Sequence, residues 1–330
     1  MININNLKTK KIIGWGTGEL LKQCLKKFNI KLDYIIDNNT EKWDKSINEI
    51  LIKNPDSLMQ EDVNDIVIVI FSSFYEDIIA TILRYGKFKF YYYSELDCYY
   101  EIGVNNEYKR FKWVIDNLQK LADGSRILDA GAGEQKYKRF CNTLEYVSQD
   151  FNQYDGNGNR SGLQTQKWDY SGINIVCDII SIPQPNESFD TILCTEVFEH
   201  LPNPIKAIEE FSRLIRKGGK LILSAPFCSL THFAPYHYYS GFNNYFYEYH
   251  LKNNNFKILE IVPNGSYFEY IAQELRRLSY VTSKYSTYKL NEDEKHRIED
   301  MINILKEIQG QSKESDGLLC SGYQIVAEKE

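Results

Sequence analysis

One glycine-rich turn has the residue types of a ligand site. The stretch RILDAGAG at 126–133 is an apolar run that ends in Asp129 and leads into Gly131 and Gly133. Missing side chains let the backbone of such a turn approach a bound ligand closely. The G-x-G-x-x-G fingerprint of dinucleotide sites is broken, because Lys136 stands where its third glycine would be. The turn therefore suits a ligand that has no pyrophosphate to seat.

Acidic residues follow the next apolar runs at positions where a ribose can be held. Asp150 closes YVSQD at 146–150, roughly 20 residues beyond the glycines, and a carboxylate there can accept hydrogen bonds from both ribose hydroxyls. Asp178 and Ile179 follow the next short strand, in IVCDII. The turn and these acids together indicate one ligand site at the edge of a sheet.

A stretch rich in aromatic residues and histidine, at 231–250, is the best candidate for the wall of a second binding site. Its rings and its Asn and His donors suit a sugar ring or another amphipathic molecule. The residues predicted to line the pocket are His232, Tyr236, His237 and Tyr238. The second half has the pattern of an amphipathic helix, and the residues expected in its core are Tyr245, Phe246 and Tyr249.

Two acids and a histidine lie close together in TEVFEHLPNP, directly after an apolar run. His200 can act there as a general base, or it can tie a loop to the start of a helix. Spacings of three and four would place Glu196, Glu199 and His200 on one face of a helix.

A second glycine turn occurs near the start of the chain, in IIGWGTGE. Gly14 and Gly16 are followed by Asp37, 23 residues beyond Gly14, which suits a ribose contact in a mononucleotide-binding half. Glu19 replaces the third fingerprint glycine, and only one βαβ-like half is visible. NAD held for redox chemistry is therefore disfavoured.

The elements that must position these residues alternate between strand and helix. Apolar runs such as DIVIVIF at 65–71 are typical of strands buried in parallel sheets, and helical stretches separate them. The pattern restarts after a helix expected at 104–122, and the runs at 256–263 and 322–329 add two strands. We predict two α/β domains, a small Rossmann-like one at 1–100 and a larger one at 101–330.

Composition and charge narrow the class of protein. Of 330 residues, 43% are hydrophobic and 25% charged, as in ordinary globular proteins with a sizeable core. The net charge of −6, without a dense Lys/Arg block, disfavours nucleic acid as a partner. The seven cysteines form no C-x-x-C pair, which indicates a reducing, cytoplasmic compartment. An apolar signal core and a run of 18 apolar residues are both absent, so neither secretion nor a membrane span is expected.

The ordered motifs from RILDAGAG to FDTILCTEVFEH at 189–200 resemble the class I S-adenosylmethionine-dependent methyltransferases. They are most similar to the small-molecule, type 11-like branch, whose fourth strand has the pattern FDxxxCxEVxEH. The resemblance covers roughly residues 105–330, including a seventh strand at 322–329. It implies a Rossmann-like sheet of seven strands and S-adenosylmethionine as the cofactor.

The resemblance also implies roles for the residues that match its motifs. Asp129, Gly131 and Gly133 would contact the methionine and ribose portions of the cofactor, and Asp150 the ribose hydroxyls. Asp178 and Ile179 would flank the adenine. Thr195 and Glu196 would line the methionine end.

Methyl transfer needs an aligned acceptor and, for a hydroxyl, a base. The predicted catalytic residues are His200, His237 and Glu196. We predict no metal. The alternative is a divalent cation held by Glu196, Glu199 and His200, because some related methyltransferases of ubiquinone precursors and RNA 3′ ends use an E-x-x-E-H set. A zinc site from His232, His237 and His250 is disfavoured, since no cysteine or acid is spaced to complete it.

Residues 8–98 are similar to the small Rossmann-like domains attached to bacterial sugar-modifying enzymes. That resemblance leaves two roles open. The domain either holds a nucleotide-linked sugar, with Gly14, Gly16 and Asp37 as contacts, or serves for docking or dimerisation, with glycines that only shape the turn.

The sequence thus predicts a cytoplasmic methyltransferase that O-methylates a sugar or nucleotide-linked sugar in bacterial surface-polysaccharide biosynthesis. The alternatives are a quinone, lipid-like or natural-product acceptor, a non-catalytic protein that binds S-adenosylmethionine, and a dehydrogenase that uses the first glycine turn. A homodimer is left open.

Overall fold

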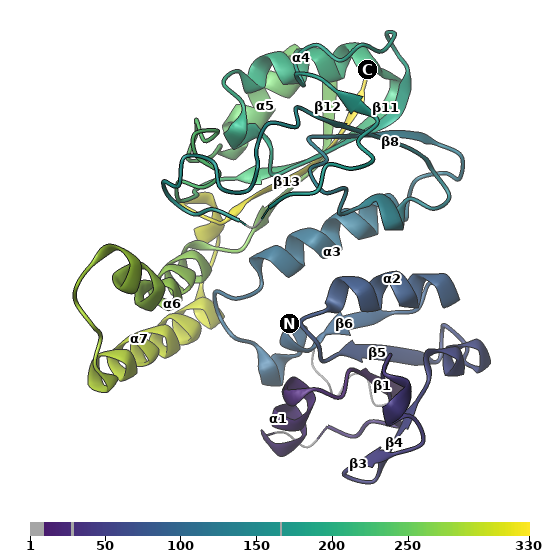
Figure 1. Cartoon of the computed structure of the whole chain (residues 1–330), viewed down its shortest axis with the longest axis vertical. Helices are drawn as coiled ribbons and strands as arrows, with labels where there is room; N and C mark the ends of the chain where they lie inside the picture. Colours follow the sequence, from purple (N-terminus) through teal and green to yellow (C-terminus); the bar gives the residue numbers. More distant parts are fainter. Residues whose placement is uncertain (1–9, 28–29, 166) are drawn as a thin grey trace. The chain divides into compact units, whose positions relative to one another are not determined.

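In the computed structural model the chain divides into two units, residues 1–101 and 102–330, of which residues 10–27, 30–165 and 167–330 are described (Figure 1). Within these described ranges, every helix is too short or too polar to cross a lipid bilayer.

The first unit is built on a six-stranded sheet with the order β3-β4-β2-β1-β5-β6. The central strands β1 (Lys11–Trp15) and β5 (Ile66–Ile70) pair in parallel and are almost wholly buried, which is why both are unbroken apolar runs. The other strands are β2 (Tyr34–Ile36), β3 (Ser46–Ile47), β4 (Ile50–Lys53) and β6 (Phe90–Tyr92). Helices α1 (Glu19–Lys27) and α2 (Tyr75–Tyr85) bury their apolar sides in this unit.

The second unit contains a seven-stranded sheet, as the resemblance implied, with the order β12-β13-β11-β10-β7-β8-β9. The bounds are β7 (Arg126–Ala130), β8 (Glu145–Asp150), β9 (Ile175–Val176), β10 (Phe189–Thr195), β11 (Ile215–Pro226), β12 (Phe256–Asn264) and β13 (Gly322–Lys329). Strands β7 to β11 are parallel, so the loops that follow β7, β8 and β10 meet at one edge. Strand β13 is antiparallel to both of its neighbours.

Helices cover both faces of this sheet (Figure 1). Helices α4 (Pro204–Leu214) and α5 (Asn244–Asn253) share one hydrophobic core with the strands. Helix α3 (Asn106–Leu118) lies on the opposite face. Helices α6 (Tyr267–Tyr285) and α7 (Glu292–Gln311) pack on each other and project from the sheet between β12 and β13.

Helix α5 has a different buried side from the one expected. Its side chains at Tyr247 and Leu251 are fully buried, whereas Tyr245 and Tyr249 are 69% and 66% exposed. The helix begins after the capping side chain of Asn243, and this start decides which side chains face the core. Because aromatic residues stand at nearly every position here, the sequence pattern did not show which of them would be buried. The core placement of Tyr245 and Tyr249 was therefore wrong.

Candidate active site

The glycine turn after β7 is packed tightly against its neighbours. Gly131 and Gly133 have φ angles of +75° and +49°, which side chains rarely adopt. A Cβ on Gly131 would lie 2.5 Å from Val197, and one on Gly133 would lie 2.7 Å from the ring of Trp168. The glycines are thus required by the protein's own packing, beyond any ligand that approaches the turn.

Asp150, at the end of β8, is tied to this turn. Its carboxylate accepts hydrogen bonds from the backbone N–H of Gly133 at 2.9 Å and of Asn152 at 2.8 Å. Burial raises the pKa of Asp150, and these backbone N–H donors oppose the rise. Asp150 also lines a cavity of this unit, where it can receive the hydroxyls of a ligand.

Asp129 is buried beneath the glycine turn and is not among the residues that line the cavity. It is buried and accepts a hydrogen bond from the hydroxyl of Tyr146 at 2.6 Å. Burial raises its pKa to about 7, the Tyr146 hydroxyl opposes this rise, and nearby Asp150 adds to it. The residue therefore braces the end of β7, and its carboxyl group does not line the cavity.

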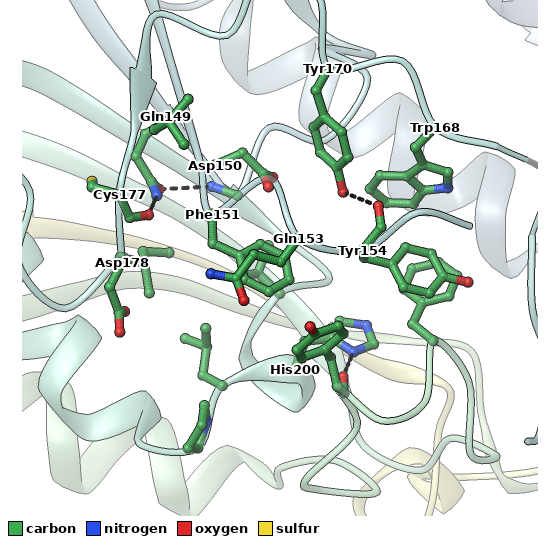
Figure 2. Close-up of a pocket in the computed structure, with 18 of the residues that line it drawn as sticks. Gln149, Asp150, Phe151, Gln153, Tyr154, Trp168, Tyr170, Cys177, Asp178 and His200 are labelled. Carbon is green, nitrogen blue, oxygen red and sulfur yellow. Dashed lines mark hydrogen bonds between the residues drawn. The ribbon is translucent and has the colours of Figure 1, made fainter. Parts of the chain in front are cut away.

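The cavity itself has a volume of about 470 Å³, within the range of small-molecule sites. Figure 2 shows Cys177 and Asp178 on one side of it and Tyr154 and Trp168 on the other. The sequence-predicted residues that line it are Gly131, Asp150, Asp178, Ile179, Glu196, His200, Tyr236 and Tyr238. Those outside its lining are Asp129, Gly133, Thr195, His232 and His237.

Glu196 is held at the cavity wall by partners from two elements. Its carboxylate forms an ion pair with Arg110 of α3 at 3.1 Å and accepts a hydrogen bond from Ser224 of β11 at 3.0 Å. Its φ of +55° is unusual for a residue with a side chain and marks a locally constrained backbone. Sequence reasoning missed Arg110, because a single arginine in an amphipathic helix carries no motif.

His200 has a defined tautomer in this arrangement. Its Nδ1 lies 2.5 Å from the carbonyl oxygen of Tyr236, so Nδ1 carries the proton and donates it (Figure 2). Burial lowers the pKa of His200, which keeps the ring neutral near pH 7. Within the described part of the chain, its Nε2 has no hydrogen-bond partner. A neutral imidazole is the state that a base requires, but this Nε2 is buried next to Glu199 at 3.6 Å rather than open to the cavity.

Glu199, His200 and His232 form a cluster beside the cavity. The Glu199 Oε1 atom lies 3.6 Å from His200 Nε2 and 3.7 Å from His232 Nε2. Burial disfavours a charge on His232, but Glu199 outweighs this and raises its pKa. The other oxygen of Glu199 is buried without a partner among the described residues.

The cluster differs from both metal sets considered in the sequence. The three residues Glu199, His200 and His232 bring their ligand atoms within 4.8 Å of one another, and Glu196 is not among them. The turn Phe198–His200 is a single 3₁₀ turn, so the expected helical face does not form, and Glu196 points to its ion pair instead. His250, which belonged to the disfavoured zinc set, lies in α5 and is not part of the cluster. Glu199 supplies the acidic ligand that the zinc set had lacked.

An aromatic cover over the cavity went unnoticed in the sequence. We call residues 151–165 and 167–173 the cover segment. It is attached by backbone hydrogen bonds to the loop after β11, between Leu163 and both Thr231 and Phe233, at 2.9 and 3.0 Å. The ring of Tyr154 stacks on Phe233 at 4.7 Å, and Trp168 meets Phe233 edge-on at 5.3 Å. The segment has no helix or strand periodicity, so its sequence gave no structural signal.

In the first glycine turn, which lies in the other unit, the groups expected to contact a ligand bond to the protein itself. Both oxygens of Asp37 accept hydrogen bonds, from the backbone and hydroxyl of Thr17, from Asn39 N–H at 2.8 Å and from Lys42 at 3.1 Å. Burial opposes ionisation of Asp37, but these contacts prevail and lower its pKa. A Cβ on Gly14 would lie 2.9 Å from Leu32 in the core, and Gly16 adopts a φ of +101°.

Comparison with known proteins gives a family match over more than half of the chain. The family model described as "Methyltransferase domain" matches residues 105–283. A ubiquinone biosynthesis O-methyltransferase of Dechloromonas aromatica (strain RCB) is 32% identical over 151 residues, which is 40% of this chain and 62% of that protein. An uncharacterized methyltransferase of Anoxybacillus flavithermus is 47% identical over 49 residues, 14% of this chain and 23% of that protein.

The chain spans less than two thirds of the length of these curated relatives. Among solved structures, a SAM-dependent methyltransferase from Archaeoglobus fulgidus aligns with a TM-score of 0.43 and 15% identity, over 68% of this chain and 94% of that one.

Proposed function

The chain belongs to the family of methyltransferase domains whose methyl donor is S-adenosylmethionine, and we propose that it transfers the methyl group to a hydroxyl oxygen of a small, ring-bearing acceptor. The observation that carries this proposal is that one cavity is lined by both sets of residues. Asp150 and Asp178 lie on one side of it, and His200 and aromatic rings lie on the other. Such a cavity offers a nucleoside site and an acceptor site in direct continuity.

The proposed reaction is an in-line displacement. The acceptor oxygen attacks the methyl carbon, the carbon–sulfur bond breaks, and its electrons stay on sulfur as S-adenosylhomocysteine leaves. His200 is the proposed base for the hydroxyl proton: its Nδ1–H is fixed by the Tyr236 carbonyl, and its Nε2, buried beside Glu199 in this structure, must open to the cavity when the acceptor binds. Arg110 and Ser224 keep the Glu196 carboxylate in place at the cavity wall, and its negative charge suits the sulfonium of the bound donor.

The first test is calorimetric titration with S-adenosylhomocysteine. We expect about one equivalent to bind, and an Asp150→Ala variant to bind at least tenfold more weakly because the ribose contact and the brace on Gly133 are lost. Glu145→Ala is the matched control, since Glu145 is an exposed acid on the same strand. Absence of binding to folded wild-type protein would refute the proposal. Binding without turnover of any acceptor would favour the non-catalytic alternative.

Two classes of acceptor fit a cavity walled by aromatic rings. A sugar, free or nucleotide-linked, fits because a ring face such as that of Trp168 can stack on a pyranose; this is the surface-polysaccharide hypothesis. A quinol, phenol or natural product fits the same rings, and the similar protein of Dechloromonas aromatica is named for ubiquinone biosynthesis. A turnover panel that contains a free glycoside, a nucleotide sugar and a catechol, with S-adenosylhomocysteine formation as the readout, separates them.

The alternative is a metal-assisted reaction, with Glu199, His200 and His232 as the ligands in place of the set expected from the sequence. Two unpartnered buried atoms, Glu199 Oε2 and His200 Nε2, and the nearby His232 imidazole have the donor chemistry of a divalent-cation site. Such a cation would act as a Lewis acid on the acceptor oxygen. Turnover that survives EDTA unchanged, together with no calorimetric binding of Mg²⁺, Mn²⁺ or Zn²⁺, would support the metal-free reaction that we favour.

For the first unit we propose a docking or dimerisation role. Both carboxylate oxygens of Asp37 already accept hydrogen bonds, and Gly14 packs against the core. These contacts support the view that Asp37 and the glycines shape the turn rather than hold a nucleotide. Titration with UDP-glucose tests this: binding that is lost in an Asp37→Ala variant, but retained in Asp150→Ala, would overturn it in favour of the nucleotide-sugar role.

A further inference from the structure

The cavity has a distinctive pattern of charge. Its lining includes the carboxylates of Asp150, Asp178 and Glu196, and among the described lining residues there is neither a lysine nor an arginine. Arg110 lies behind Glu196, outside the lining, and is already engaged by that carboxylate at 3.1 Å. A phosphate placed in the cavity would meet like charges and find no cationic side chain to balance it.

The acceptor side of the same cavity consists mainly of rings. Tyr154, Trp168, Phe233 and Tyr236 line it, and the first three contact one another. The Tyr154 hydroxyl donates to Gln164 at 2.7 Å and the Trp168 N–H donates to Thr165 at 2.7 Å, so the polar ends of both rings are used within the cover segment. What remains toward the cavity is apolar ring surface.

Building on the methyl transfer proposed above, we infer that the cavity admits an acceptor as an uncharged ring and excludes acceptors that carry a phosphate within it. Nucleotide-linked sugars are then not direct substrates, whereas a hydroxylated ring without phosphate is. Trp168 determines this specificity by stacking on the ring, and the Glu196 carboxylate at the cavity wall disfavours the anion.

The mouth of the cavity offers a way to reverse the preference. Tyr238 lines the cavity and is 49% exposed, so a longer polar side chain can replace it without entering the core. Tyr238→Lys would supply the missing positive charge at the acceptor side. A preference set by charge should respond to this change, whereas one set by shape alone should not.

The test uses full-length protein saturated with S-adenosylhomocysteine, in EDTA and at low ionic strength. Two matched probe pairs are titrated by ligand-observed NMR: phenyl β-glucoside with its 6-phosphate, and catechol with catechol monophosphate. We expect at least one neutral probe to bind and its phosphorylated partner to bind at least tenfold more weakly. Tyr238→Lys should narrow that gap at least threefold.

Trp168→Ala should weaken the neutral probe at least fivefold, whereas Tyr245→Ala, a change at an exposed ring outside the cavity, should leave it unchanged. Equal or tighter binding of the phosphorylated partner, failure of both neutral probes, or no effect of Trp168→Ala would overturn the inference. Since saturation with S-adenosylhomocysteine is measured first, failure of the proposed methyl transfer is seen separately, as loss of that binding.

Discussion

Gly133 illustrates how single residues set the geometry of this site. It gives its N–H to Asp150 at 2.9 Å while the ring of Trp168 lies directly over its Cα. One glycine therefore joins Asp150 to the cover segment, and a side chain at this position would disturb both.

We expect Gly133→Ala to lower the free energy of unfolding of its unit by about 1–3 kcal/mol, from the left-handed backbone and the contact with Trp168. Urea denaturation measures this. In a Trp168→Ala background the cost should shrink, because the ring that the new Cβ meets is gone. Gly310→Ala is the control: it lies in α7 with open space around it and should stabilise by up to about 1 kcal/mol.

Asp129 gives a prediction for pH dependence. Its pKa rises from 3.8 to about 7 on folding, so the folded state favours the protonated carboxyl. Its stabilising contribution is complete below pH 4 and is lost as the pH rises through 7. Relative to wild type, Asp129→Asn should therefore gain up to about 4 kcal/mol between pH 4 and pH 8. Urea denaturation of both proteins across this range measures it, and parallel curves would contradict the assignment.

At the scale of elements, the cover segment depends on a few backbone contacts. The carbonyl oxygen of Ala234 accepts from Asn159 N–H at 2.9 Å, and Gly158 lies so close to that carbonyl that a Cβ would fall on it. Close to the same point, Lys284 at the end of α6 donates to the carbonyl of Gly162 at 3.0 Å. The segment is thus fastened to two separate elements.

Gly158→Ala should detach the cover segment from the loop after β11. We expect amide hydrogen exchange at Leu163 and Phe233, whose N–H groups bond across this junction, to accelerate at least tenfold. Asn157→Ala, an exposed neighbouring change, should leave both rates as they are. Unchanged exchange in the Gly158 variant would mean that the aromatic stack alone holds the segment.

The elements also explain how far the sequence could predict this structure. Buried parallel strands such as β5 and β10 appear as apolar runs, so the sheet and the residues at its edge, Asp150 among them, were predictable. The cover segment was not, because its polar and aromatic residues have no period and their partners, such as Phe233, lie far along the chain. Arg110 acts through one contact across the fold, which no local pattern records.

At the scale of the whole molecule, the two units have separate hydrophobic cores. We expect calorimetry of the full chain to resolve two unfolding transitions, and S-adenosylhomocysteine to raise only the one that belongs to residues 102–330. At a ligand concentration of 100 times Kd the stabilisation should be about 2.7 kcal/mol. Asp150→Ala is the control, and a single transition that shifts as a whole would show that the two units unfold together.

The place of β13 has a consequence for how the protein is made. This strand follows every other strand of its sheet along the chain, yet it lies between β11 and β12. During synthesis at roughly 5–20 residues per second, those two strands and the helices α6 and α7 leave the ribosome seconds before the strand that joins them. Until β13 arrives, β11 and β12 each present an unpaired edge to other nascent chains. The interval before β13 emerges is therefore the stage at which this sheet is most open to mispairing.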